Sequence, residues 1–283
     1  MKPRKLVNEK FRLKDMPTRP DKGIDHPSEQ IDELQLDLLR AQLALFKENK
    51  RAIILIEGTD TAGKGGIIRR ITRHLDPRSA HVWPIGAPER WEQSRHYLFR
   101  FWQRLPEPGE LTIFDRSWYG RVLVERVEGH ANAEEWKRAY REINEFERQL
   151  TEDGVILIKL FLHLSKDEQY ARFMERIREP TKRWKIKVSD LESRRFWNEY
   201  QRAYDDMLNR TATDFAPWFV LSADDKDYAR VHALKLIGKQ LKKHVDLQRV
   251  NLLDPQVIAA IIDQFGEDVL RDDLVQASHG QSD

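Results

Sequence analysis

The sequence contains no cysteine among its 283 residues, so it has neither disulfide bonds nor thiol chemistry, and this agrees with a reducing cytoplasm. Long apolar runs are also missing. No stretch approaches the roughly 20 residues that cross a bilayer, and the first residues lack the apolar segment of a signal peptide. We therefore expect a cytoplasmic protein with no membrane partner.

A strong excess of one charge is the third absence. The net charge is only +2, so any site for a polyanion must be a local basic patch and not a field of the whole molecule. Apolar residues make up 40% and charged residues 34%, which describes a soluble globular protein. The length allows one domain with attachments.

The most informative stretch is residues 51–73, RAIILIEGTDTAGKGGIIRRITR. An apolar β-branched run at 52–56 predicts a buried strand of a parallel sheet. Residues 58–64 match G-x-x-x-x-G-K, and apolar side chains then recur at the helical spacing of Ile67, Ile68, Ile71 and Leu75. Strand, glycine-rich turn and helix are the context that this phosphate-binding motif requires, which favours it over a chance match.

In such a loop, backbone N–H groups and the start of the helix face phosphate oxygens, and the lysine adds a mobile positive charge. We assign Lys64 to catalysis. The phosphate cradle is assigned to the surrounding residues Gly58, Thr61, Ala62, Gly63, Gly65 and Gly66. The motif usually continues with Ser or Thr, whose hydroxyl binds magnesium, but Gly65 stands there. We therefore expect another metal ligand, and Asp60 inside the loop is the candidate.

A second landmark is residues 111–119, LTIFDRSWY. An apolar strand that ends in an aspartate is the arrangement that holds magnesium opposite a phosphate loop. Asp115 is therefore the second predicted metal ligand, and Arg116 would present its fork of donors to phosphate oxygens. The alternative is that Asp115 caps a helix and Arg116 is solvated.

A basic segment follows further along the chain. A helix that begins at Lys166 carries Arg172 and Arg176, which lie four residues apart on one face. It leads into the proline-broken stretch 178–187 and a helix at 190–208. We interpret residues 166–208 as a lid over phosphates, with a solvated basic surface as the alternative. Arg176 is assigned to catalysis, and phosphate binding to Arg121, Arg172, Lys182 and Lys185.

The remaining chain alternates strands with helices. We predict strands at 81–85, 155–164 and 218–221, and helices at 29–47, 89–104, 134–152, 228–243 and 257–265. Ser28 is the expected cap of the first helix, the aromatic residues of 89–104 are expected in the core, and His163 is expected to be a core histidine. This alternation predicts a parallel sheet covered on both faces, with ligands at the carboxyl edge of its strands.

Three regions are expected. Residues 1–27 form a basic arm, with Lys2, Arg4, Lys5, Lys10, Arg12 and Lys14 solvated; a disordered tail is the alternative. Residues 28–245 form the domain that carries the phosphate loop. Residues 246–283 hold a helix and a polar tail.

Four motifs in this order resemble the polyphosphate kinase 2 family over roughly residues 30–245. They are GTDTAGKGG at 58–66, DRSWYGRVLVERV at 115–127, EPTKRWK in the lid, and APW at 216–218 followed by ADDK. The resemblance implies an α/β fold with a thymidylate-kinase-like parallel sheet and a helical lid. It implies that Asp60 and Asp115 hold the metal, Mg²⁺ or in its place Mn²⁺.

The activity implied is reversible transfer of a terminal phosphoryl group between inorganic polyphosphate and a nucleoside mono- or diphosphate (AMP/ADP or GMP/GDP). The DRSWYGRVLVERVEG stretch is closer to monophosphate users, whereas ADDK occurs in diphosphate users as well. The resemblance also implies a homo-oligomer, a dimer or a tetramer, with the helix at 29–47 as a candidate interface.

The chemistry of the residues agrees with this resemblance. A nucleotide phosphate ionises a second time near pH 6, so it needs no general base at neutral pH. Catalysis would consist of positioning and charge neutralisation along an in-line path. A polyphosphate chain needs a basic track, for which the candidates are Arg69, Arg70, Arg73, Lys182, Arg183 and Lys185.

Two other functions remain open from the sequence. One is an ATP-dependent nucleoside monophosphate kinase on the same fold, although Gly65 argues against it. The other is a non-enzymatic protein that binds polyanions or nucleic acid, which would leave the spacing of Asp60, Lys64 and Asp115 without purpose. We expect no nucleic-acid partner.

Overall fold

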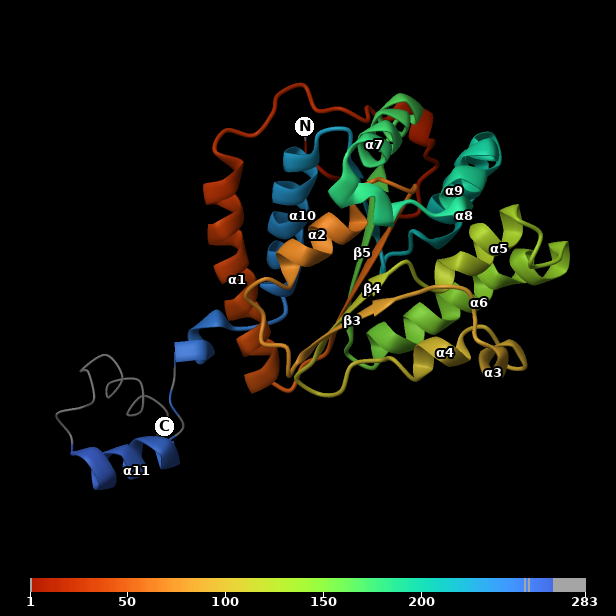
Figure 1. The fold of residues 1–283 in the computed structure, drawn as a ribbon. Coiled ribbons are helices and arrows are strands. Elements are labelled where there is room, and N and C mark those ends of the chain that lie inside the picture. Colours follow the sequence, from red (N-terminus) through yellow and green to blue (C-terminus); the bar gives the residue numbers. More distant parts are fainter. Residues whose placement is uncertain (1, 252, 254, 267–283) are drawn as a thin grey trace.

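The computed structural model describes residues 2–251, 253 and 255–266, and within them six strands form one sheet in the order β1–β6–β5–β2–β4–β3. The strands are β1 (Arg4–Leu6), β2 (Ala52–Gly58), β3 (Ala80–Pro84), β4 (Leu111–Asp115), β5 (Ile156–His163) and β6 (Trp218–Ser222). Neighbouring strands are parallel, except that β1 runs antiparallel to β6. The carboxyl ends of β2, β4, β5 and β6 therefore meet at one edge (Figure 1).

Helices cover both faces of this sheet. One face carries α1 (Pro27–Lys47), α2 (Lys64–Ile71) and α10 (Lys226–Leu241), and the other carries α4 (Phe99–Trp102), α6 (Ala133–Glu152) and α9 (Trp197–Thr211). Side chains of β2 alternate between the two layers: Ile53 and Leu55 enter one core, while Ile54 and Ile56 enter the other. The predicted fold class is confirmed.

The long helices also lie where the apolar spacing predicted them. α6 begins with a capping box in which Asn132 and Glu135 exchange hydrogen bonds with each other's backbone. α1 begins differently from the prediction, because Pro27 occupies its first turn after His26, and no side chain caps it. Ser28 lies inside the helix, so its predicted capping role was wrong. α11 (Pro255–Phe265) matches the predicted helix at 257–265, whereas the predicted polar tail beyond residue 266 lies outside the described residues.

The predicted helix at 89–104 was wrong. The chain forms two short helices, α3 (Arg90–Gln93) and α4, because the buried Glu92 draws the chain back on itself by pairing with Arg100 and Arg104. Phe101 enters the core as expected, but Trp102 keeps about half of its surface exposed, at 47%. The aromatic residues of this segment are therefore only partly core.

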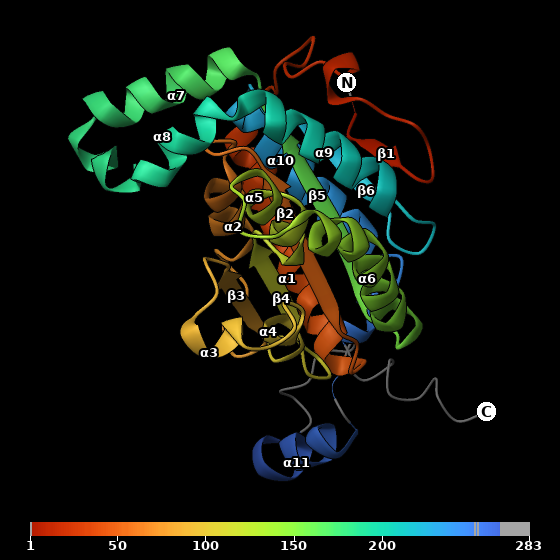
Figure 2. The same cartoon turned by 90° about the vertical axis from the view of Figure 1, so that its right-hand side faces the viewer.

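The predicted lid helix at 190–208 is also two helices, α8 (Val188–Arg195) and α9, which meet at Phe196. α9 packs on the sheet through Ala203, Met207 and Leu208, all fully buried. Of the residues predicted as the lid, α7 (Lys166–Arg178), the 3-10 helix η3 (Pro180–Lys185) and α8 project beyond the sheet, and Figure 2 shows α7 and α8 doing so. Apolar spacing could not separate a projecting helix from one that continues into the core.

The N-terminal segment is ordered and packed. Leu6, Phe11, Leu13 and Met16 are buried, although the six cations of this segment are exposed as predicted. Its β1 strand extends the sheet, and η1 (Leu13–Asp15) lies against α9 through the Leu13 N–H, which donates to Asp205 Oδ1 at 2.8 Å. The disordered-tail alternative is wrong, because its four buried apolar residues join one of the two core clusters.

Three further short helices complete the described chain: η2 (Trp118–Val122), α5 (Val124–Val127) and η4 (Leu247–Asn251). His163, at the end of β5, is buried, and its ring lies 3.2 Å from the Met16 carbonyl oxygen, so it is the core histidine that was predicted. Of the helices described, none is long and apolar enough to cross a bilayer.

Candidate active site

The glycine-rich loop joins β2 to α2 at the carboxyl edge of the sheet. Gly58 has φ +140°, and a Cβ there would lie 2.6 Å from the Leu162 carbonyl oxygen on β5, so no other residue fits without moving the strand. Gly63 has φ +106° at the start of α2, a conformation that favours glycine. By contrast, a Cβ added to Gly65 would meet no atom within 4 Å, so there is room for the usual Ser or Thr. Its missing hydroxyl is therefore a chemical difference and not a steric one.

Lys64 is buried beneath this loop. Its ammonium donates to the carbonyl oxygens of Gly58 at 2.6 Å and Thr59 at 3.1 Å. Burial lowers the pKa of Lys64, and the positive charge of Arg116 lowers it further, while the carboxylates of Asp60 and Asp115 oppose both effects. The lysine is thus surrounded by the residues that the sequence predicted would act with it.

Arg116 links the end of β4 to the loop. It has φ +64°, and its backbone N–H donates to the Ile56 carbonyl oxygen at 3.2 Å. Its guanidinium donates to Asp60 Oδ1 at 2.6 Å. Burial alone would lower the pKa of Arg116, but the carboxylates of Asp60, Glu57 and Asp115 together raise it, so the charge is firmly held.

Asp115 lies opposite the loop, paired in register with Ile56 of β2. In the described part of the chain, its carboxylate makes no hydrogen bond or ion pair, yet it acts electrostatically on Lys64 and Arg116. No cluster of three or more metal-binding side chains occurs among the described residues. Mg²⁺ needs only one or two carboxylates, because substrate phosphates and water complete its shell, so the donor set of Asp60 and Asp115 fits this ion.

The model of a family described as polyphosphate kinase 2 matches residues 23–249. This chain belongs to the polyphosphate kinase 2 family. The predicted resemblance over residues 30–245 is therefore confirmed.

Relatives within the family carry several names. A polyphosphate:AMP phosphotransferase of Pseudomonas syringae pv. tomato is 50% identical over 223 residues, covering 77% of this chain and 45% of that protein. An ADP-polyphosphate phosphotransferase of Pseudomonas aeruginosa is 42% identical, over 75% and 70% of the two chains. The crystal structure of polyphosphate kinase 2 from Arthrobacter aurescens superposes with a TM-score of 0.82 at 32% identity, over 89% and 93%. The chain thus spans less than half the length of the AMP-named relative.

Of the side chains predicted for the lid, Arg176 lies within electrostatic reach of the loop. Arg176 of α7 carries a pKa that burial lowers and that the Asp190 and Asp60 carboxylates raise. Its guanidinium lies 3.9 Å from Asp190 and donates to the Lys185 carbonyl oxygen at 3.3 Å. Arg176 therefore acts on Asp60 of the loop through its charge, while its direct contacts are with Asp190 and Lys185.

The other predicted phosphate-binding side chains lie elsewhere or are engaged by protein groups. Lys182 pairs with Glu175 at 2.6 Å, and the ammonium of Lys185 stacks over the exposed Trp184 ring. Arg121 pairs with Glu125 at 3.2 Å and lies over the Tyr97 ring. Arg172 reaches the loop, but there it donates to the Thr61 carbonyl oxygen.

Sequence reasoning missed several residues of this site. Glu57 is buried directly before Gly58, where burial raises its pKa, and it accepts a hydrogen bond from Ser117 at 2.8 Å. An acid at the end of a fully apolar strand was the available signal. Beside Asp60, a small cavity is lined by the aromatic rings of Trp197, Tyr200 and Tyr204, and no local pattern distinguishes these from other core aromatics.

Proposed function

We propose that this chain transfers a terminal phosphoryl group reversibly between inorganic polyphosphate and a purine nucleoside mono- or diphosphate, without a covalent intermediate. The observation that carries the proposal is the group of Asp60, Lys64, Asp115 and Arg116 at one sheet edge, in a loop where Gly65 replaces the usual hydroxyl. Membership of the polyphosphate kinase 2 family and the names of the relatives support it.

The protein's contribution is positioning and charge neutralisation. Lys64, Arg116 and Arg176 offset the charge that spreads over the oxygens of the transferred group, and they are fixed before substrate arrives. A phosphate acceptor is already ionised at neutral pH. The site therefore requires no general base.

Asp60 and Asp115 would hold Mg²⁺, or Mn²⁺ in its place. Bound there, the ion would supply neutralisation of phosphate charge. The chain's own residues would hold the donor and acceptor in line. Asp60 would at the same time keep Arg116 oriented, since their side chains are in contact in the structure.

A track for polyphosphate would run along α2. Arg69 and Arg73 are exposed. Burial is the main cause that lowers the pKa of Arg70, and the positive charges of Arg230, Arg69 and Arg73 lower it further. Repulsion among these arginines indicates a local excess of positive charge, which a polyanion would relieve. The lid cations Arg183 and Lys185, which are exposed, would extend the track.

Among acceptors we favour AMP, since the relative named for AMP is more similar to this chain than the relative named for ADP. We keep ADP and the guanine nucleotides as further acceptors. A homo-oligomer, dimer or tetramer, also remains part of the proposal. On α1, Leu36 and Phe46 are 51% and 60% exposed and would lie in its interface.

The test offers long-chain polyphosphate and Mg²⁺ with AMP and with ADP in separate reactions. We expect ADP to form from AMP, and ATP to form from ADP more slowly. In parallel, ATP replaces polyphosphate as donor. Activity only with ATP would reassign the chain to the nucleoside monophosphate kinases, and silence in all arms, with polyanion binding retained, would favour the non-enzymatic binder.

A further inference from the structure

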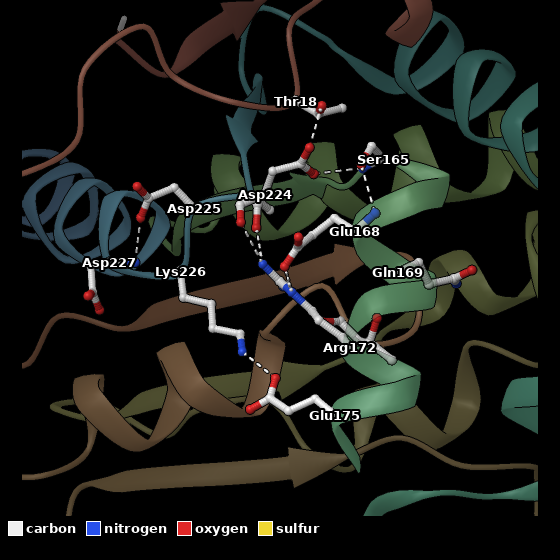
Figure 3. Close-up of polar contacts among 12 residues, drawn as sticks. Thr18, Ser165, Glu168, Gln169, Arg172, Glu175, Asp224, Asp225, Lys226 and Asp227 are labelled. Carbon is white, nitrogen blue, oxygen red and sulfur yellow. Dashed lines mark hydrogen bonds and ion pairs between the residues drawn. The ribbon is translucent and has the colours of Figure 1, made fainter. Parts of the chain in front are cut away.

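Arg172 binds backbone carbonyl oxygens from two separate segments of the sheet edge. It lies in the middle of α7 with only 4% of its surface exposed. Its Nη1 donates to the Thr61 carbonyl oxygen at 2.9 Å, and its Nη2 donates to those of Ala223 at 2.6 Å and Asp224 at 3.1 Å. Its Nε donates to Glu168 at 2.8 Å. Four of its five N–H groups are thus used within the protein (Figure 3).

The bond to Thr61 has a particular consequence for the phosphate loop. Thr61 has φ +66°, a conformation that is costly for a residue with a branched Cβ. Holding its carbonyl oxygen fixes the plane of the next peptide, and Gln169 on the same helix approaches the Asp60 carbonyl oxygen at 3.4 Å. Two successive loop carbonyls are therefore directed toward α7.

Asp224 connects this arrangement to the N-terminal segment. Its two carboxylate oxygens accept hydrogen bonds from the Ser165 N–H, at 2.8 Å, and from the Thr18 hydroxyl, at 2.7 Å. Its own N–H donates to the Thr18 carbonyl oxygen at 3.0 Å. Ser165 caps α7. Thr18 therefore holds Asp224, whose carbonyl oxygen receives Arg172 and whose carboxylate binds the N-cap residue of α7 (Figure 3).

We propose that Arg172 is a positioning residue that holds the phosphate loop in its strained shape, and that Thr18 and Asp224 set the position of Arg172. We call Thr18, Asp224 and Arg172 the α7 junction. The consequence for catalysis rests on the proposed function, but the effect on loop order does not. The N-terminal segment is then part of the active-site support, and Arg172 is not a phosphate ligand.

The junction explains features that a phosphate-binding Arg172 would leave without a reason. A ligand for phosphate should present several N–H groups to the solvent side of the loop. Arg172 instead donates most of its N–H groups to backbone carbonyl oxygens. Lysine could supply the same charge but could not span Thr61 and Ala223 at once. The two roles therefore predict opposite results for Arg172→Lys.

The first experiment measures amide hydrogen exchange of residues 59–66 in the full chain. In Thr18→Val, which keeps the shape of the side chain but loses the hydroxyl, we expect exchange there to rise about fivefold or more. Thr18→Ser should restore the wild-type rate. The control is Asn8→Gly, which removes a similar contact from the same segment to Asp214, at 2.9 Å, and suits the φ of +46° at that position. It should leave residues 59–66 unchanged.

The second experiment measures phosphoryl transfer from polyphosphate. Arg172→Lys and Arg172→Ala should both lower kcat by about tenfold or more. Thr18→Val should also lower kcat, and it should change the KM for polyphosphate by a smaller factor than it changes kcat. Wild-type activity in Arg172→Lys beside a loss in Arg172→Ala would assign a charge role and overturn the proposal. Unchanged exchange at 59–66 in Thr18→Val would also overturn it. An inactive wild type would refute the proposed function alone, since the exchange measurement would still decide the junction.

Discussion

The guanidinium of Arg116 donates to Oδ1 of Asp60 at 2.6 Å, and this contact joins the residue after β4 to the loop after β2. The two residues lie 56 positions apart in the chain. Both were predicted to act on phosphate or metal, but as separate groups. Their contact means that the predicted metal ligand and the predicted phosphate-binding cation orient each other.

Arg116→Lys should lower kcat by about 100-fold, because a lysine cannot hold Asp60 and also present a second donor to phosphate. Stability should change by no more than about 1 kcal/mol, since the pair is partly exposed. Steady-state kinetics and urea unfolding check the two parts. Arg138→Lys, in the exposed Arg138–Glu142 pair of α6, is the control and should keep full activity. Equal kinetics for the two variants would contradict the role of Arg116.

Asp115→Asn should lower phosphoryl transfer by about 1000-fold or more, because it removes the charge that would hold the metal opposite the loop. Binding of polyphosphate, measured by titration without nucleotide, should change little. Asp153→Asn is the control, since that exposed aspartate pairs with Arg51 at 2.9 Å away from the loop. Activity near wild type in Asp115→Asn would refute the metal assignment.

Gly58→Ala should lower the free energy of unfolding by about 2–4 kcal/mol, because the new Cβ meets a β5 carbonyl oxygen at a backbone angle unsuited to alanine. Gly65→Ala should raise it by about 0.5–1 kcal/mol, since the helix gains a better former in open space. Urea unfolding of both variants provides the comparison. A loss of stability of similar size in both would show that the crowding at Gly58 is not the cause.

Glu147→Gln should destabilise the protein by about 3–5 kcal/mol, because it leaves a buried charge without its partner. Glu147 and Lys159 are both fully buried, 2.7 Å apart, and Glu147 also accepts from Trp118 and Tyr119. Glu145→Gln on the same helix is the matched control and should cost less than about 0.5 kcal/mol, since Glu145 is exposed. Similar unfolding free energies for the two variants would show that the buried pair contributes little.

Glu175 makes stability depend on pH. Hydrogen bonds from Lys182 and Lys226 lower its pKa from 4.5 to about 2. A depressed carboxyl pKa stabilises the fold above pH 4.5, and this contribution is lost as the pH falls toward 2. Because the side chain is 40% exposed, we expect only about 0.5–1 kcal/mol. Between pH 6 and pH 3 the free energy of unfolding should fall by that amount less in Glu175→Gln than in the wild type. Equal decreases in the two proteins would contradict the assignment.

Much of the candidate site at the carboxyl edge of the sheet was predictable, because the sequence patterns that mark it are local. Residues 52–64 carry strand, loop and lysine within one short stretch, and Asp115 follows its strand directly. A parallel sheet then brings the ends of β2 and β4 together, so the meeting of Lys64 with Asp115 follows from topology. The partner of each side chain did not follow. Lys182 and Arg172 have the same local appearance as phosphate ligands, yet Glu175 binds one and backbone carbonyl oxygens bind the other.

The sequence by itself determined the alternation of strands and helices, the phosphate loop and the family, because periodicity and motif spacing lie within short windows. Only the tertiary structure decided that residues 4–6 become an edge strand, that α9 packs in the core and not in the predicted lid, and that Thr18 binds Asp224, which receives Arg172. These outcomes depend on contacts between residues far apart in the chain. Such contacts are selected by burial and hydrogen bonding in three dimensions, and they leave no local pattern to read.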